Sequence, residues 1–355
     1  MTSRRRFNAA LVSGIAASLL PEALVHAAQS PLLPSSAGIW AARRMPTVVG
    51  TGPTGAMKHT RLAVDPVNQR IYFCGGDYVG PPQFYESGQQ ALYSYEVNTN
   101  QWRSEFPYCA PHGEIQPLHP VQVGWTFDTK RKVFWMLPGF EFATVEPARN
   151  CGDTVHNKVM SFDPTARVWS VAPQDPLPPM GGLRKFAQYD DATDSIVMFN
   201  NDSACVFYPA TGKWKLYPFG GNRYMSGNYT AKVDRHIYCI DNRYKKLSRY
   251  DIDERSMTDV CPMGFDPGRM EETNFVFDAS HNSLVFAKFG SWAYFPPEVW
   301  LYNIGSGRWA QLPVDIPGVA KPMANCMVYH PGTRQTVLLG GVVPANPYMF
   351  LLRLS

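Results

Sequence analysis

A short pattern recurs six times along the chain, and it limits the fold more than any other feature of the sequence. In each copy a tryptophan or a methionine is followed a few residues later by proline. The six pairs are Trp40 and Pro46, Trp102 and Pro107, Trp169 and Pro173, Trp214 and Pro218, Met257 and Pro262, and Trp309 and Pro313. Such spacing is typical of an array built from one supersecondary unit, so one repetitive domain is expected.

A second repeat runs in phase with the first and predicts the strands. Apolar runs end at six turn residues, and a second apolar run begins a few residues after each of them. The turn residues are Asp65, Asp128, Asp190, Asp234, Asp278 and His330. With a second hairpin in each unit, every repeat has four strands, which is the make-up of a propeller blade. The sequence therefore predicts an all-β, six-bladed β-propeller.

The spacing of aromatic residues predicts how the ring closes. Another aromatic residue stands seven residues before five of the six lead residues, as Tyr95 does before Trp102. Trp40 has no such partner upstream, so its partner is expected near the other end of the chain, at Tyr348 or Phe350. We therefore expect an N-terminal outermost strand (strand d of a blade) to pair with the C-terminal blade.

The first repeat also resembles a known family. The apolar segment Ile71–Gly76 ends in two glycines, and Tyr95 and Trp102 follow it. This order resembles the kelch repeat of the galactose oxidase and kelch-like superfamily. The last repeat keeps the glycine pair at Gly340-Gly341, whereas the second to fifth repeats lack it. The resemblance implies a kelch-type propeller over the mature chain, and it does not imply one activity, because a shared fold hosts many functions.

Composition supports short strands and argues against a nucleic-acid surface. Charged residues make up only 17% of the chain and aromatic residues 13%, with 28 glycines and 31 prolines, which suits many strands and turns. The formal net charge is +4, and about +2 remains when the three arginines and Glu22 of the leader are removed. Nothing here predicts binding to DNA or RNA.

The N-terminal residues resemble an export signal. Ser3–Phe7 resembles the twin-arginine motif, the mildly apolar stretch Ala9–Leu20 follows, and small residues stand at Ala27-Ala28. Pro21 and Glu22 interrupt the apolar stretch, which is too short to span a membrane. We therefore expect residues 1–28 to be a cleaved signal peptide and residues 29–355 to form one propeller, periplasmic or secreted, with no membrane span.

A ring of polar residues is the first candidate site. Strand a, the first of each blade, is innermost, and we expect its alternate residues to separate a channel face from a face packed between blades. Six residues before each turn residue the chain has His59, Gln122, Arg184, Asn228, Glu272 and Ala324. Five of the six are polar, and they fall at the start of strand a, where the long loops open. Either these residues are simply solvated, or they form a pocket for a polar small molecule or glycan.

Loop residues at the same face extend this candidate site. Further ligand-binding candidates are Arg223, Tyr224, Tyr229, Arg269 and Trp292. An arginine offers a planar fork to a carboxylate, and an aromatic ring can stack on a sugar face. The sequence therefore predicts a polar small molecule or glycan as the partner, and an envelope protein is the alternative partner if the chain is an interaction scaffold.

The third hypothesis for this face is that it carries an enzyme active site. His59 and Glu272 could act as a catalytic acid and base, since both would point to the channel mouth. The kelch resemblance is compatible with this reading, because six-bladed relatives include an N-acetylneuraminate epimerase. A sugar isomerase or epimerase therefore stays open as an alternative.

Metal and disulfide candidates lie in the loops of the second blade. We predict no cofactor, and the weak metal candidates are His112, His119, Asp153 and His156, whose spacing matches no compact motif. Of seven cysteines, Cys109 and Cys151 are the candidate disulfide, because both fall in the two long insertions. Buried, inert thiols are expected at Cys74, Cys205, Cys239 and Cys326.

Overall fold

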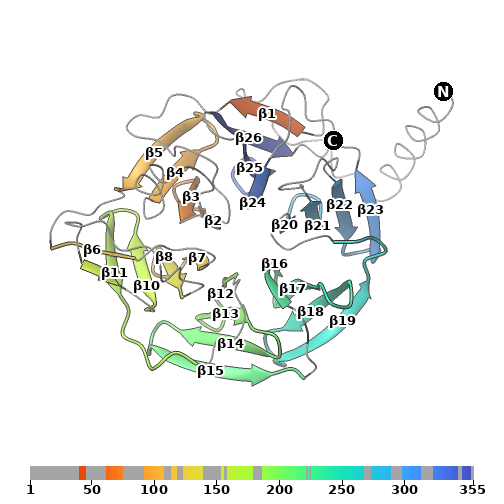
Figure 1. The fold of residues 1–355 in the computed structure, drawn as a ribbon, viewed down its shortest axis with the longest axis horizontal. Helices are drawn as coiled ribbons and strands as arrows, with labels where there is room; N and C mark the ends of the chain where they lie inside the picture. Colours follow the sequence, from red (N-terminus) through yellow and green to blue (C-terminus); the bar gives the residue numbers. More distant parts are fainter. Residues whose placement is uncertain are drawn as a thin grey trace.

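The chain is an arrangement of antiparallel sheets around a central space (Figure 1), seen in a computed structural model. The structure describes residues 40–44, 61–74, 92–107, 113–117, 123–138, 153–155, 158–178, 186–220, 223, 225–267, 273–288, 298–312, 323–342 and 346–352. These residues form six four-stranded sheets and one two-stranded sheet, with no helix among them. The prediction of an all-β propeller arrangement is confirmed.

Each four-stranded sheet is built from strands that follow one another in the chain, with a single exception. The first three sheets contain β2 (Arg61–Asp65), β3 (Arg70–Cys74), β4 (Leu92–Glu96) and β5 (Gln101–Phe106); β7 (Gly124–Asp128), β8 (Val133–Leu137), β10 (Met160–Asp163) and β11 (Val168–Val171); and β12 (Gln188–Asp190), β13 (Ser195–Phe199), β14 (Ser203–Tyr208) and β15 (Lys213–Pro218). The next two contain β16 (Met225–Val233), β17 (His236–Asp241), β18 (Lys246–Asp251) and β19 (Ser256–Pro262); and β20 (Thr273–Asp278), β21 (Ser283–Lys288), β22 (Glu298–Asn303) and β23 (Arg308–Leu312).

The exception is the sheet that holds the last strands of the chain. It contains β24 (Met323–His330), β25 (Gln335–Val342) and β26 (Asn346–Leu352), and its outermost strand is β1 (Trp40–Arg44). β1 runs antiparallel to β26, with Trp40 opposite Leu352 and Arg44 opposite Tyr348. Segments from the two ends of the chain therefore lie side by side in one sheet (Figure 1).

Two of the repeated turn residues, Asp65 and Asp128, show how the hairpin between the first two strands of a sheet is stabilised. Asp65 Oδ1 accepts the backbone N–H groups of Val67 and Asn68 at 2.8 and 3.1 Å, and Gln69 then adopts a positive φ of 55°. Asp128 makes the same pair of bonds in the second sheet. A short carboxylate that accepts two backbone donors fixes such a turn, which explains why aspartate recurs there.

The seven-residue aromatic spacing is the register of the outer hairpin. Tyr95 lies opposite Trp102, and their rings are 5.0 Å apart between centroids. The same opposition holds for Phe162 and Trp169, Phe207 and Trp214, Tyr250 and Met257, and Tyr302 and Trp309. These rings fill the core between neighbouring sheets, where Tyr95 and Trp102 are almost fully buried.

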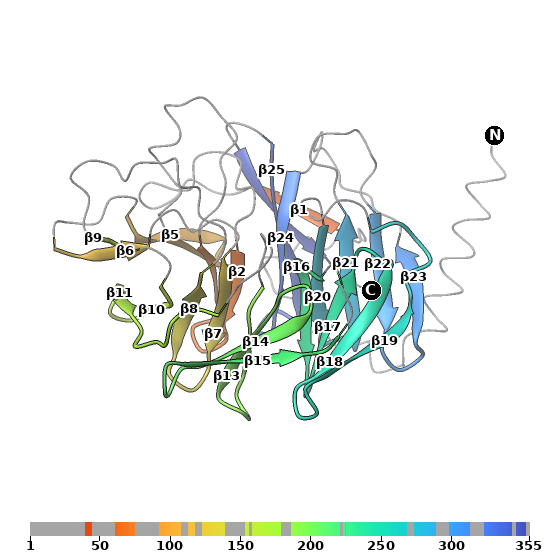
Figure 2. The same cartoon turned by 60° about the horizontal axis from the view of Figure 1, so that its bottom comes forward.

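Two short strands lie outside the main sheets. β6 (Ile115–Pro117) pairs in parallel with β9 (Asp153–Val155), and Ile115 lies opposite Asp153. Figure 2 shows this pair at the edge of the molecule beyond β5, away from the central strands. The pairing joins the two long insertions of the sequence.

Candidate ligand-binding site

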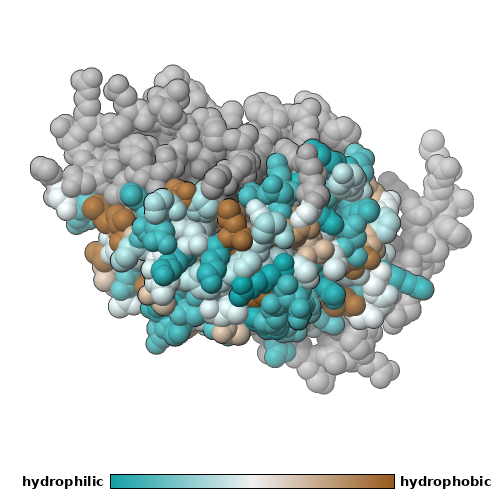
Figure 3. Space-filling view, turned by 90° about the horizontal axis from the view of Figure 1, so that it is seen from below, coloured by the Kyte–Doolittle hydropathy of each residue, from teal (hydrophilic) through white to brown (hydrophobic). Residues whose placement is uncertain are grey.

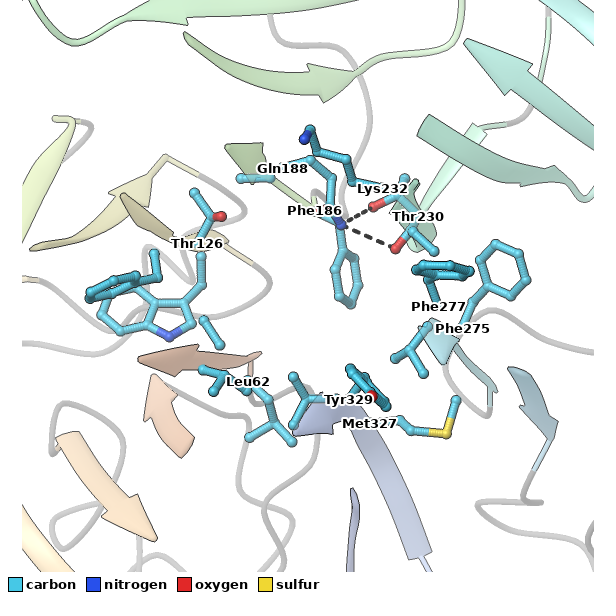
Figure 4. A pocket seen from close by; sticks show the side chains of 18 of the residues that line it. Leu62, Thr126, Phe186, Gln188, Thr230, Lys232, Phe275, Phe277, Met327 and Tyr329 are labelled. Atoms are coloured by element: carbon cyan, nitrogen blue, oxygen red, sulfur yellow. Dashed lines mark hydrogen bonds between the residues drawn. The ribbon is translucent and has the colours of Figure 1, made fainter. Parts of the chain in front are cut away.

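The innermost strands of all six main sheets enclose an axial cavity (Figure 4). Its volume is about 370 Å³. The lining comes from β2, β7, β12, β16, β20 and β24, together with adjoining residues. Pockets of some 300–1,000 Å³ with mostly apolar walls and a few polar groups are typical of small-molecule sites.

The cavity occupies the end of the channel where the tight turns lie. Pro66, Thr129 and Pro331, which line it, each follow the last residue of an inner strand. The lining residues furthest from those turns are Phe186 and Thr230, four residues before Asp190 and Asp234. The described cavity therefore extends from the tight turns to two residues short of the predicted ring of polar residues.

One wall of the cavity is polar and the facing wall is apolar. Figure 4 shows Gln188, Thr230 and Lys232 together on the side formed by β12 and β16, with Leu62 and Tyr329 across the space. Gln188 Nε2 donates to the backbone oxygen and to Oγ1 of Thr230, both at 3.2 Å. The Gln188 amide is therefore held against β16.

An aromatic ring extends into the middle of the cavity. Phe186 precedes β12, and Figure 4 shows its ring projecting into the central space. The guanidinium of Arg61 lies 4.4 Å from the centroid of this ring, which is a cation–π contact. Arg61 is only 2% exposed, and its Nε donates to the backbone oxygen of Val123 at 3.2 Å. The buried guanidinium of Arg61 therefore packs against the ring of Phe186.

Charge near the polar wall is held in an ion-pair cluster. Lys232 Nζ lies 3.3 Å from Asp190 Oδ1, and Arg235 donates to the same carboxylate oxygen. Burial by itself raises the pKa of Asp190, but the hydrogen bonds from Arg235 and Thr193 and the charge of Lys232 outweigh it and lower that pKa. Asp190 is thus held as a carboxylate, and it forms an ion pair with the ammonium group of Lys232.

The cavity lining corrects one expectation from the sequence. Alternate residues of the inner strands were expected to separate a channel face from a packed face, yet consecutive residues such as Leu62, Ala63 and Val64 all line the cavity. Ala63 packs toward Trp125 of the second sheet, whereas Leu62 and Val64 pack with Val337 of the last sheet. Both faces of a sheet are covered by its neighbours, so it is the edge of the inner strand that meets the axis.

Of the predicted ligand-binding residues, Arg223 is the one whose side chain is described. Its Nη1 donates to Asp259 and to Ser248 Oγ, 3.2 Å away, so it lies over β18 and β19 and does not line the axial cavity. The hydrogen bonds from Lys246 and Arg223 lower the pKa of Asp259 to about 2. The structure therefore gives Arg223 a structural ion pair.

The structure does not describe the side chains of the other predicted site residues. Asn228 and Tyr229 lie within β16 and Asp153 lies within β9, with their side chains outside the described part. The following residues lie outside the described residues altogether: His59, His112, His119, Gln122, His156, Arg184, Tyr224, Arg269, Glu272, Trp292, Cys109 and Cys151. Within the described ranges no group of three or more His, Cys, Asp or Glu residues is placed to hold a metal. The expected buried thiols are confirmed at Cys74, Cys205 and Cys239.

The residues of the described cavity were not selected from the sequence. A signal for its polar wall was present, because positions two and four before the turn residue are polar at Gln188, Lys232 and Thr230. Phe186 shares the position of Thr230, four residues before the turn residue, but it is aromatic where Thr230 is polar, so the polar signal does not mark it. Long loops carry function more often than tight turns do, which favours the other end of the channel.

Comparison with known proteins defines the chain as a β-propeller. The solved structure titled "Structure of YjhT" superposes with a TM-score of 0.54, at 11% sequence identity, over 83% of this chain and 94% of that chain. At this identity the likeness shows the fold alone. No family model and no curated protein sequence matches the chain. None of the described residues form a helix long and apolar enough to cross a membrane.

Proposed function

We propose that the chain is an exported, six-bladed kelch-type propeller that binds a polar small molecule or glycan at the loop-rich end of its central channel. The observation that carries this proposal is the arrangement of the six inner strands around one central channel. In this proposal each four-stranded sheet is a blade, and the pairing of β1 with β26 closes the ring.

The inner strands link the cavity to the proposed site. Each of them runs toward its tight turn. In this proposal the segments that precede them meet at the other end of the channel. Arg184 stands two residues before the lining residue Phe186, and Glu272 stands directly before β20. At about 3.3 Å per residue, six residues of extended chain separate the polar ring from the turn residues by roughly 20 Å.

The described residues on the face drawn in Figure 3 form no broad apolar surface of the kind that supports an interaction scaffold. Figure 3 views the molecule from below relative to Figure 1, and the apolar residues on this face form small separate groups among polar ones. The exposed large apolar side chains of the described part are Val67, Val168, Val171, Leu216 and Tyr244. A partner surface would present them as one contiguous patch.

The test is a binding experiment with the mature protein. N-Acetylneuraminate and glucose serve as acidic and neutral sugar probes, and binding is followed by melting temperature and calorimetry. The variant is Arg184→Ala, and the matched control is Arg308→Ala, an exposed arginine of β23. The proposal expects a rise in melting temperature with one sugar class that Arg308→Ala keeps and Arg184→Ala loses.

Three results would count against this proposal. Absence of any sugar-induced shift, or an equal shift in Arg184→Ala, contradicts a site at this mouth. Conversion of the bound sugar, followed by NMR and lost in Glu272→Gln, would favour the isomerase or epimerase reading.

Export is tested separately from binding. The full chain and a variant with Arg4, Arg5 and Arg6 all replaced by lysine are expressed in a bacterium, and the cell fractions are compared. Twin-arginine export predicts that the wild type leaves the cytoplasm in shortened form and that the lysine variant stays inside. Equal export of both proteins contradicts this route.

A further inference from the structure

We propose that the cavity at the tight-turn end of the channel is a second site, which binds a small uncharged aromatic molecule whose edge carries a hydrogen-bond donor beside an acceptor, such as an aromatic amide. This inference is independent of the sugar site proposed at the loop-rich end, because none of the cavity residues belongs to that site.

The apolar part of the ligand follows from the walls. Six aromatic residues line the cavity: Trp125, Phe127, Phe186, Phe275, Phe277 and Tyr329. Phe186, Phe277 and Tyr329 keep part of their surface exposed, so aromatic surface faces open space inside the channel. Aromatic rings prefer offset or edge-to-face contact with other rings, and walls on several sides offer both arrangements to a planar ligand.

The polar edge of the ligand follows from the orientation of Gln188. A carbonyl oxygen cannot donate, so the Gln188 atom 3.2 Å from the backbone oxygen of Thr230 has to be the amide nitrogen. The Gln188 carbonyl oxygen is the acceptor that remains beside this wall. Thr230 Oγ1 accepts from Gln188 and keeps its own hydrogen for donation. The wall therefore presents an acceptor and a donor side by side, which matches an amide.

Charge in the cavity argues for a neutral ligand. Lys232 is the one cation among the lining residues, and its ammonium group lies 3.3 Å from Asp190 and 3.9 Å from Asp191. A carboxylate ligand would have to compete with these two carboxylates, and a cationic ligand would be repelled by Lys232 and Arg235. An uncharged amide neither competes with these carboxylates nor is repelled by the two cations.

The test uses benzamide as the probe, with benzoate and cyclohexanecarboxamide as comparison probes. Binding to the mature protein is measured by calorimetry and ligand-observed NMR. Saturable binding of benzamide is expected, with each comparison probe at least tenfold weaker, because benzoate changes the charge and cyclohexanecarboxamide removes the aromatic ring.

Matched variants locate the site. Gln188→Met removes the amide while keeping the length of the side chain, and it is expected to weaken benzamide binding at least fivefold, as loss of about one hydrogen bond does. Thr230→Val removes the hydroxyl and leaves the backbone oxygen in place, so it tests the same edge if Gln188→Met fails to fold. The control is Gln311→Met on the exposed side of β23, which is expected to bind as wild type does.

Three outcomes would overturn the inference. They are no saturable binding of benzamide, unchanged binding in both Gln188→Met and Thr230→Val, and equal affinity for all three probes. A channel that holds only water gives the first of these. Arg184→Ala separates this site from the sugar site, because it is expected to abolish sugar binding and to leave benzamide binding unchanged.

Discussion

His330 Nε2 lies 3.0 Å from the backbone oxygen of Gln69, and this contact joins the last inner strand to the first hairpin of the chain. His330 Nδ1 accepts the backbone N–H of Thr333 at 3.1 Å, so the ring is neutral with its hydrogen on Nε2. The imidazole is buried. Burial lowers the pKa of His330, and the bond to Gln69 only partly opposes this effect.

The stability of the fold should therefore fall in mild acid through His330. The unfolded chain takes up a proton near pH 6.5 while the folded ring stays neutral. The contribution of His330 to the free energy of unfolding is therefore constant above that pH. Below it, the free energy of unfolding decreases by at most about 1.4 kcal/mol per pH unit. Urea unfolding of wild type and His330→Asn from pH 5 to 8 should give a flatter profile for the variant. Parallel profiles for the wild type and His330→Asn would exclude this role of His330.

Asp190 should be a major stabilising residue of the third and fourth sheets. Its buried carboxylate pairs with Arg235 and Lys232 of the neighbouring sheet, so Asp190→Asn removes the carboxylate that the two cations share. Of the described carboxylates, only the more exposed Asp253 and Asp191 then stay near them. We expect a loss of about 2–4 kcal/mol in chemical denaturation at pH 7. Because the folded pKa is lowered, this contribution is present above about pH 4 and is lost as the pH falls further. Asp191→Asn, whose side chain is 73% exposed, should change stability by less than about 0.5 kcal/mol, and equal effects of both variants would contradict the prediction.

Gly212 should resist substitution for two separable reasons. Its φ is +68°, and a Cβ there would lie 2.3 Å from the backbone oxygen of Pro173. Gly264 has a similar φ of +74° with nothing within 4 Å of its Cβ position. Gly264→Ala should cost about 1–2 kcal/mol for the backbone conformation alone. Gly212→Ala should cost about 1–3 kcal/mol more, because of the clash between the second and third sheets. Thermal unfolding of both variants tests this order, and similar melting temperatures would show that the clash relaxes freely.

Removal of β1 should destabilise the sheet that contains the last strands. A chain that begins at Met45 leaves β26 as an open edge with unpaired backbone groups. A lower melting temperature and a tendency to aggregate are expected, relative to a chain that begins at Gly38. A peptide covering residues 38–46, added in excess, should raise the melting temperature of the shorter chain. Identical melting of the two chains would show that β1 contributes nothing to closure.

Local spacing was sufficient to predict the strands and their registers. The pairing of Tyr95 with Trp102 and the turn at Asp65 each depend on residues a few positions apart, so the sequence encodes them directly. The seven-residue pairing held in all five hairpins, with Met257 in place of a tryptophan in one of them, because a tight hairpin fixes its register over short distances. The polar ring that includes Arg184 and Glu272 was predicted by the same counting and stays a prediction.

The cavity and the contacts between sheets were decided by the tertiary structure. Arg131 pairs with Asp194 and Arg235 with Asp190 across 63 and 45 positions of the chain, and no local pattern marks these partners. Phe186 reaches the axis and meets Arg61 only because the angle between neighbouring sheets turns their inner edges toward one point. The sequence by itself determined the repeating unit, since hydrogen bonding and strand alternation act over a few residues. The packing of whole sheets decided which edges meet, and therefore which side chains share the axial cavity.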